Sequence, residues 1–399
     1  MIKCSSLVLK VASRCNLNCT YCYMYNLGDM TYKNQPKIMS DETVDAILLK
    51  TKNHCINHNL KEFVFIFHGG EPLLCGISFF QRFIDQAHEI LLPEVIPYFS
   101  LQTNAVLIDN EWVNFFIDNN ISVSCSLDGY KEVNDKYRVY HNGKGSFDDI
   151  LEGINTLKRN HAFNIQLNVL SVLNLDANPK LLLEFFDKNN LDFDLLLLDA
   201  NYDKLPFKKT SFTDTIYADW LCEVFDIWYD NYSHLHIRFF VNIMLIILGK
   251  NSSTDGYGKG INELLIIETD GGIEAVDVLK ICGDGFTKNG LNILTNEMDE
   301  AFNSELINKF VYANERLPEK CSKCSLSDIC GGGYLPHRFS SENHFDNPSI
   351  YCHDLAKLIT HIQNKIFNDM PQNIIDETNF EHFSYEDFLT EFNLTTNEC

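Results

Sequence analysis

Three cysteines near the start of the chain have a spacing that suits a metal site. Cys15, Cys19 and Cys22 form the pattern Cys-x3-Cys-x2-Cys. The same spacing would place them on one stripe of a buried helix, but polar neighbours such as Asn16 and Thr20 disfavour that alternative. A [4Fe–4S] cluster normally binds four thiolates. Three local ligands would leave one iron open, and an open metal position is where a substrate or cofactor binds.

A second set of cysteines lies toward the end of the chain. It comprises Cys321, Cys324, Cys330 and Cys352. Four thiolates are enough to close a metal site, and they suit Zn²⁺ as well as an iron–sulfur cluster. From the spacing alone, a structural zinc site is the favoured interpretation.

The two sets account for half of the 14 cysteines. In a reducing compartment such spacings indicate metal ligation or redox chemistry and not a disulfide framework. The remaining cysteines are isolated, and we interpret them as ordinary small residues; they are Cys4, Cys55, Cys75, Cys125, Cys222, Cys282 and Cys399.

Composition narrows the classes of function. The 399 residues are 45% hydrophobic, and 55 Asp and Glu against 32 Lys and Arg give a net charge of −23. So acidic a chain is a poor partner for nucleic acid. We see no apolar run of the roughly 18–20 residues that a membrane span needs, and no signal peptide. We therefore expect a cytoplasmic protein with no nucleic-acid or membrane partner.

Short apolar strands alternate with amphipathic helices over the first 240 residues or so. Ser40 is a plausible N-cap of the first helix. Such alternation predicts an α/β fold whose parallel sheet curls into a partial or full barrel, with chemistry at the carboxyl ends of the strands. The predicted strands are 7–12, 63–67, 98–102, 123–127, 164–170 and 193–198, and later helices are 79–90, 111–118, 147–159, 179–188 and 214–229.

The pattern changes after about residue 245. Residues 251–260 are rich in Gly, Ser and Asp and indicate a loop or linker. The segment up to about residue 354 is rich in Gly and Cys, and a weakly packed domain of this kind often depends on a metal. We predict a barrel over 1–245, a cluster domain over 246–354, and a helical, acidic tail over 355–399.

Short polar motifs follow the second, third and fourth predicted strands. They are His68-Gly69-Gly70-Glu71-Pro72, Gln102-Thr103-Asn104-Ala105, and Ser126-Leu127-Asp128-Gly129 with Asn134–Arg138 beyond it. Together with the first cysteine set, in which the aromatic Tyr21 precedes the last Cys, they resemble the radical S-adenosylmethionine (SAM) enzymes. Each motif alone is weak, but all of them follow separate strands in the order that the family has.

The resemblance implies a partial (β/α)6 barrel that binds SAM and a [4Fe–4S] cluster on the first three cysteines. It places Glu71 near the methionine amine, Ser126 near the ribose and Arg138 near the carboxylate. A donor such as flavodoxin or ferredoxin would reduce the cluster, and a 5′-deoxyadenosyl radical would then remove hydrogen from an unactivated carbon. The remaining implied SAM-binding residues are Tyr21, His68, Gly69, Gly70 and Asn104.

In this context the second cysteine set resembles the SPASM domain of peptide-modifying members of the family. That resemblance reverses the zinc interpretation and implies one auxiliary [4Fe–4S] cluster, so two clusters in all. Two positions depart from the SPASM pattern, because Val276 and Tyr334 stand where it has Cys. The other auxiliary cluster of such enzymes therefore lacks ligands, and Cys282 alone could not supply them.

Residues 276–283, 330–338 and 347–352 look like those of the cyclophane-forming maturases of ribosomally synthesised peptides. Those enzymes join an aromatic ring carbon to the β-carbon of a nearby residue. Asp277 stands where sulfatase-maturing SPASM enzymes have a base, and the resemblance implies that it takes the proton released when the ring regains aromaticity. The alternative is that Asp277 merely caps a turn or helix.

We therefore expect a radical SAM oxidoreductase that cross-links a ribosomal precursor peptide, recognising both its leader and its core. Because the first strand begins almost at Met1, we expect the barrel, the cluster domain, the tail or another protein to bind the leader. Other modifications with the same clusters, sulfatase-maturase-like oxidation or thioether formation, are the alternatives among enzymes. A zinc-stabilised binding protein is the alternative outside them.

Overall fold

The computed structural model describes residues 2–159, 167–250, 254–371, 373–374 and 382–396. Contacts divide the chain into two compact units. The first comprises Met1–Val172 and Glu263–Val311, and the second comprises Leu173–Asn262 and Tyr312–Cys399. The domain boundaries that we predict at residues 245 and 354 stay a prediction.

The first unit is built on a curved, mostly parallel sheet. Its strands lie in the order β5-β4-β3-β2-β1-β7-β8, and only the β7–β8 pair is antiparallel. The predicted α/β class and parallel sheet are confirmed. The strands are β1 (Ser6–Ala12), β2 (Glu62–Gly69), β3 (Ile96–Thr103), β4 (Ser122–Ser126), β5 (Asn168–Val172), β7 (Leu264–Ile267) and β8 (Ile273–Glu274).

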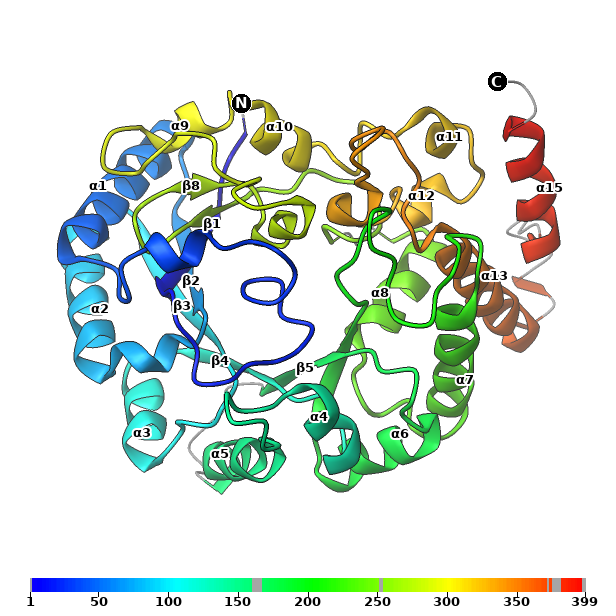
Figure 1. The fold of residues 1–399 in the computed structure, drawn as a ribbon, viewed down its shortest axis with the longest axis horizontal. Coiled ribbons are helices and arrows are strands. Elements are labelled where there is room, and N and C mark those ends of the chain that lie inside the picture. Colours follow the sequence, from blue (N-terminus) through cyan, green and yellow to red (C-terminus); the bar gives the residue numbers. More distant parts are fainter. Residues whose placement is uncertain (1, 160–166, 251–253, 372, 375–381, 397–399) are drawn as a thin grey trace. The chain divides into compact units, whose positions relative to one another are not determined.

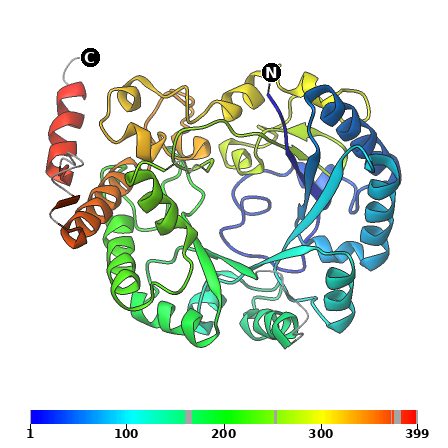
Figure 2. The same ribbon diagram turned by 180° about the vertical axis from the view of Figure 1, so that it is seen from behind.

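Helices cover the outer side of these strands, and Figures 1 and 2 show α1, α2 and α3 outside the arc of β1–β4. The Ser40 side chain accepts a hydrogen bond from the Thr43 backbone N–H, so the predicted N-cap of α1 is confirmed. The helices of this unit are α1 (Asp41–His58), α2 (Ile77–Leu91), α3 (Asn110–Asp118), α4 (Lys131–Tyr137), α5 (Phe147–Arg159), α9 (Met298–Ala301) and α10 (Glu305–Val311).

Aromatic side chains fill the space between the sheet and α2. Phe65 and Phe67 alternate on the buried face of β2 and pack edge-on against Phe83 of α2 at ring-centroid distances of 5.3 and 5.0 Å. Such edge-to-face pairs add to the stabilisation that burial gives. This packing holds the carboxyl ends of the strands, where the polar motifs begin, in fixed positions.

The segment Glu263–Val311 packs with the barrel strands, although it follows them by some 90 residues in the chain. Its strand β7 pairs in parallel with β1 over Leu264–Ile267, on the side of β1 opposite β2. This strand could not be predicted from the sequence, because an apolar run of four residues gives no periodic signal. The pairing brings Asp277 into the first unit.

The second unit holds the remaining helices and β6. The predicted helix 179–188 is confirmed, and the predicted strand 193–198 begins and ends slightly earlier. The elements are α6 (Pro179–Lys188), β6 (Asp192–Leu196), α7 (Ile216–Asn231), α8 (Arg238–Ile247), α11 (Glu319–Ser322), α12 (Ser327–Cys330), α13 (Cys352–Asp369) and α15 (Tyr385–Thr396).

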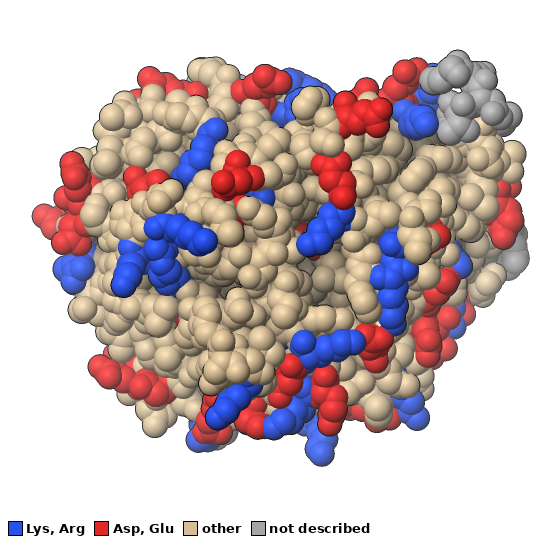
Figure 3. Space-filling view, in the orientation of Figure 1, with Lys and Arg blue, Asp and Glu red and all other residues tan. Residues whose placement is uncertain are grey.

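Two sequence predictions fall partly outside the described residues, namely the start of the fifth strand and the start of the 251–260 loop. Among the helices of the described part, none is long and apolar enough to cross a bilayer. On the face drawn in Figure 3, basic and acidic side chains are interspersed.

Candidate functional site

The first cysteine set lies in the loop that leaves β1. Gly69 and Gly70, at the end of β2, press against this loop: Gly70 donates its backbone N–H to the Ala12 carbonyl (2.7 Å). A Cβ on either glycine would collide with the backbone of Ala12 or Arg14, and Gly69 has φ +144°. The glycines at the end of β2 therefore allow a close backbone approach to Ala12 and Arg14, at the start of the cysteine loop.

The three thiols of the loop are largely buried. Burial raises the pKa of Cys15 to about 12 and that of Cys22 to about 11, and it also raises the pKa of Cys19. As free thiols they would stay protonated, so a bound metal would have to replace their protons. The Cys15 Sγ faces the Leu17 backbone N–H at 3.4 Å, and such N–H···S contacts are typical around iron–sulfur clusters.

Glu71 is fully buried beside this loop. Its carboxylate accepts hydrogen bonds from the Thr103 hydroxyl (2.8 Å) and from the backbone N–H groups of Asn104 (2.8 Å) and Leu73 (3.0 Å). Burial outweighs these bonds and raises the pKa of Glu71 to about 7. A buried carboxylate without a cationic partner is costly, so the group suits an ammonium ligand.

This pKa gives a pH prediction for SAM binding. An ammonium group bound at Glu71 favours the ionised carboxylate, so binding releases a proton and strengthens as pH rises through about 7. Equilibrium dialysis of the iron-loaded enzyme should show SAM affinity falling up to about tenfold per pH unit below that value. Glu71→Gln should bind weakly at every pH. An unchanged pH profile in that variant would contradict the assignment.

Arg138 follows α4, close to the polar motifs at the carboxyl ends of the strands. Its guanidinium donates to the Tyr21 hydroxyl (2.9 Å), and Tyr21 in turn donates to the Asp128 carboxylate (2.6 Å). Arg138 is 7% exposed, and its Nε has no hydrogen-bond partner among the described residues. A buried guanidinium with an unused donor is well suited to a carboxylate ligand.

Two further predicted SAM-binding residues, Ser126 and Asn104, also lie at strand ends. The Ser126 hydroxyl accepts a hydrogen bond from the Gln102 side chain (2.9 Å), and the Asn104 amide contacts Cys15 and Asn16. The structure thus brings Cys15, Glu71 and Asn104 together, as the order of the motifs predicted.

Asp277 is buried and lies next to β1. Its carboxylate Oδ2 forms an ion pair with Lys10 Nζ and accepts a hydrogen bond from the Tyr23 hydroxyl (2.6 Å). Val276, and not Asp277, occupies the N-cap position of the 3₁₀ helix Asp277–Cys282. The role of Asp277 as a base stays a prediction. Lys10 Nζ also lies 3.0 Å from His68 Nδ1, which joins His68 to this cluster.

The cluster fixes the charge of Asp277. Burial alone would raise its pKa, but the charge of Lys10, with hydrogen bonds from Lys10 and Tyr23, holds the pKa of Asp277 well below its usual value. Burial and Lys10 together lower the pKa of His68 to about 4, so this imidazole is neutral at pH 7. The site therefore presents an ionised carboxylate and a neutral imidazole.

Lys10 and Tyr23 were not singled out from the sequence. A signal for Lys10 existed, because a lysine within the apolar strand Ser6–Ala12 must be buried and must find a counterion. Nothing in the sequence showed which of the 55 acidic residues would supply that charge.

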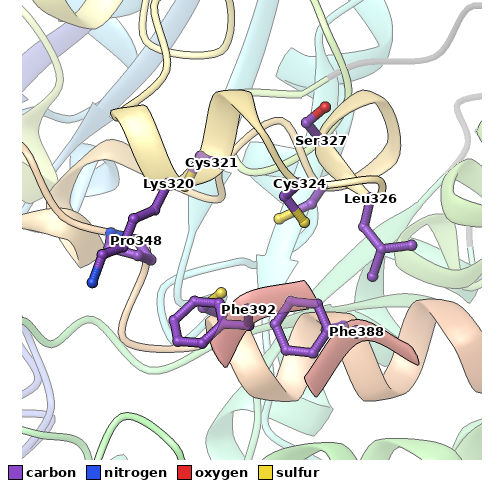
Figure 4. Close-up of a pocket in the computed structure, with 12 residues that line it drawn as sticks. Lys320, Cys321, Cys324, Leu326, Ser327, Pro348, Phe388 and Phe392 are labelled. Atoms are coloured by element: carbon purple, nitrogen blue, oxygen red, sulfur yellow. The ribbon is translucent and has the colours of Figure 1, made fainter. Parts of the chain in front are cut away.

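The second cysteine set lies wholly in the second unit. Its four thiols line one pocket, which is closed by apolar groups that include Phe388 and Phe392 of α15 (Figure 4). Burial raises the pKa of Cys321 to about 11 and that of Cys330 to about 12. The predicted set is thus brought together.

Arg338 is buried beneath this pocket and anchors its glycine loop. The guanidinium donates to the carbonyl oxygens of Gly331, Gly332, Gly333 and Ala313 at 2.6 to 2.9 Å. The three glycines all have φ between +60° and +74°, which favours glycine at each position. The arginine charge also faces Cys321 and Cys330 and so stabilises their thiolate forms.

Arg338→Gln should therefore empty the second cysteine site. Glutamine cannot span four carbonyls or supply the charge, so a [4Fe–4S] cluster held at this site would be lost, and the iron content would fall by about four atoms per chain. The control is Cys282→Ala, which removes a thiol outside the set and should keep the iron. Iron and sulfide analysis of both variants measures this; full iron content in Arg338→Gln would contradict the role given to Arg338.

The spacing of the thiols bears on what they can hold. A single tetrahedral zinc ion with Zn–S bonds of about 2.3 Å keeps its four sulfurs roughly 3.8 Å apart. Among the described residues, no three thiols of either set have all their sulfur atoms within 4.8 Å of one another, so a single zinc ion would require the thiols to move closer together.

Comparison with known proteins agrees with this geometry. The family model described as "Radical SAM superfamily" matches residues 9–178 of this chain. A cysteine-type anaerobic sulfatase-maturating enzyme of Clostridium novyi (strain NT) is 30% identical over 87% of this chain and 92% of its own length. The chain belongs to the family of anaerobic sulfatase-maturating enzymes. As a radical SAM enzyme of this family, it uses SAM and a [4Fe–4S] cluster.

Solved structures extend the likeness to both units. Native anSMEcpe with bound AdoMet (S-adenosylmethionine) is 26% identical, covers 91% of this chain and 98% of its own, and superposes with a TM-score of 0.76. The same protein with AdoMet and a Cp18Cys peptide gives a TM-score of 0.75 at 25% identity. Streptococcus suis SuiB bound to its precursor peptide SuiA shares the fold, at 16% identity and a TM-score of 0.55 over 87% of this chain and 75% of its own.

Proposed function

We propose that this enzyme oxidises a peptide side chain at its β-carbon, and that the side chain is that of a cysteine. The observation that carries the proposal is the likeness, over nearly the whole chain, to a cysteine-type maturating enzyme and to anSMEcpe with a cysteine peptide. This was an alternative in the sequence analysis, where cyclophane formation was the main expectation.

The first cysteine set would hold the SAM-binding cluster through Cys15, Cys19 and Cys22. When bound, the cluster and SAM supply a radical that removes a hydrogen atom from an unreactive carbon. The chain orients SAM: the Glu71 carboxylate holds its ammonium, and the unused Nε of Arg138 is directed to its carboxylate. The same SAM site, at the carboxyl ends of the strands, would also contain Ser126, Tyr21 and Asn104.

Asp277 would take the proton that this oxidation releases. Once a hydrogen atom has left the β-carbon, the resulting radical must lose one electron and the S–H proton, which gives a thioaldehyde. Water then converts the thioaldehyde to the aldehyde and releases hydrogen sulfide. An S–H beside a radical centre is far more acidic than an ordinary thiol, so the weakly basic carboxylate of Asp277 suffices. Lys10 and Tyr23 hold that carboxylate in place.

The electron would pass to an auxiliary [4Fe–4S] cluster on the second cysteine set. The resemblance of the second cysteine set to the SPASM domain supports a cluster over zinc, and the buried Arg338 offsets the negative charge of a thiolate-bound site. Flavodoxin or ferredoxin would supply the electron for SAM cleavage.

Cyclophane formation is the second candidate, and one observation favours it. Val276 and Tyr334 replace two cysteines of the SPASM pattern, so this chain has fewer auxiliary ligands than that pattern supplies. In this reaction the β-carbon radical bonds to an aromatic ring carbon, and the ring then loses one proton and one electron. Asp277 and the auxiliary cluster would serve both reactions.

Mass spectrometry separates the two candidates. The iron-loaded enzyme is incubated with SAM, a reductant and either a cysteine peptide or a peptide with an aromatic residue two positions before its partner. Exchange of the thiol for an aldehyde, trapped with a hydrazine reagent, supports oxidation of cysteine. A loss of two hydrogens without an aldehyde supports the cross-link. SAM cleavage that leaves both peptides unchanged contradicts both proposals.

A further inference from the structure

Two histidines and a carboxylate converge in the first unit, and none of them belongs to the sites above. His54 and His58 stand one turn apart on α1, with ring centroids 4.3 Å apart. Both rings approach the same carboxylate oxygen of Asp299 on α9. His54 Nδ1 lies 2.7 Å from Asp299 Oδ1, and His58 Nε2 lies 2.9 Å from it.

The other nitrogen of His54 decides what these contacts can be. His54 Nε2 lies 3.1 Å from the backbone carbonyl oxygen of Cys4, which can only accept. Nε2 must therefore carry the hydrogen, and in a neutral ring Nδ1 then turns its lone pair toward the Asp299 carboxylate. Two acceptors at 2.7 Å repel each other unless a proton or a metal cation lies between them.

This arrangement is the one that metal-binding histidines use. Such a histidine usually donates its second ring N–H to a backbone carbonyl or carboxylate, which fixes the tautomer and the direction of the ligating nitrogen. Here the Cys4 carbonyl plays that part for His54. The three candidate ligand atoms all lie within 4.8 Å of one another.

Burial and spacing also suit an ion. The His54 and His58 side chains are 1% and 4% exposed, whereas that of Asp299 is 35% exposed, so an ion could enter from the carboxylate side and keep bound water. Metal–nitrogen and metal–oxygen bonds of about 2.0–2.2 Å place neighbouring ligand atoms roughly 2.9–3.4 Å apart. The two histidine–aspartate distances of 2.7 and 2.9 Å lie at or just below this range, so binding an ion would lengthen them slightly.

We propose that His54 Nδ1, His58 Nε2 and Asp299 Oδ1 form a binding site for Zn²⁺ or a closely similar divalent ion. Two imidazoles and one carboxylate suit such ions, whereas the thiol sets suit iron–sulfur clusters. The ion would fasten α9 to α1, and so would hold the segment that carries Asp277 against the barrel strands.

Cobalt is the probe for this site, because oxidised [4Fe–4S] clusters are diamagnetic and high-spin Co²⁺ is not. The enzyme with its clusters loaded is stripped of loosely bound metal, given Co²⁺ and desalted without air. We expect about one retained cobalt per chain, an electron paramagnetic resonance signal with imidazole-nitrogen modulation, and displacement by Zn²⁺. Asp299→Asn and His58→Gln should each retain almost none.

The control is His236→Gln, which removes an exposed imidazole and should leave cobalt retention unchanged. Iron content, measured for every variant, shows whether the clusters and the fold persist. If His58→Gln fails to fold, Asp299→Asn still tests the site, because a partly exposed residue is the milder one to replace. If the wild-type enzyme retains no more cobalt than Asp299→Asn, the three residues form a metal-free clamp and the proposal is wrong. Equal retention in all variants would place the cobalt elsewhere and overturn it too.

Discussion

Replacing Cys15, Cys19 and Cys22 together by alanine should abolish formation of 5′-deoxyadenosine. SAM cleavage needs an iron with an open position beside Glu71 and Arg138, and no other thiols in the described part of the first unit form a set at this place. The iron content should fall by about four atoms per chain and no further. The second cysteine set lies in the other unit and should keep its iron.

The control for this triple variant is Cys222→Ala, which removes an isolated thiol of α7. Chromatography of the reaction mixtures measures 5′-deoxyadenosine, and iron analysis of the same samples measures the clusters. Continued reductive cleavage of SAM by the triple variant would show that the assigned ligands are wrong.

Asp277→Asn should separate SAM cleavage from product formation. Asparagine cannot accept the proton, so modified peptide should fall by about 10²–10⁴-fold, the usual contribution of a positioned base. Hydrogen abstraction precedes proton loss, so 5′-deoxyadenosine should still form. Quantifying both products side by side gives the ratio, and a ratio near that of the wild-type enzyme would leave Asp277 with a structural role alone.

The ion pair with Lys10 complicates this variant and suggests its control. Removing one partner leaves the fully buried lysine uncompensated, which costs about 3–5 kcal/mol of stability. The double variant Lys10→Met, Asp277→Asn removes both charges and should regain much of that stability. It should not regain product, because the base is still absent. Recovery of product in the double variant would show that Asp277 acts only by neutralising Lys10.

The same ion pair predicts how the site responds to acid. Because the pKa of Asp277 lies below its ordinary value, its contribution to stability is fully present above the ordinary aspartate pKa of about 3.9 and is lost as pH falls through the lower, folded-state value. Loss of activity between about pH 7 and 6 should therefore come from Glu71 and not from Asp277.

Local patterns gave the sequence analysis its reliable predictions. The Ser40 cap depends on a backbone N–H three residues away, and each cysteine set is recognisable because three of its members lie within ten residues of one another. The ends of the strands could also be predicted, from the periodicity of apolar residues. That prediction grouped Glu71 and Asn104 near Cys15. The family resemblance supplied the roles of these residues.

Contacts between distant segments could not be predicted. Lys10 and Asp277 are 267 residues apart, and β7, which brings them together, is too short to show a pattern. The close approach of Gly70 to the backbone of Arg14 also joins two separate segments, so no local pattern could show it. In the sequence, His54 and His58 cannot be distinguished from ordinary helix residues, because Asp299, which lies beside them in the structure, is 245 residues beyond His54.

Transfer of deuterium is the direct test of whether the enzyme oxidises a cysteine at its β-carbon. The enzyme, SAM and a reductant are given a cysteine peptide deuterated at the β-carbon of that cysteine, and the 5′-deoxyadenosine is examined by mass spectrometry. We expect the 5′-deoxyadenosine to gain deuterium in step with conversion of the cysteine to the aldehyde. Modified peptide accompanied by unlabelled 5′-deoxyadenosine would contradict it.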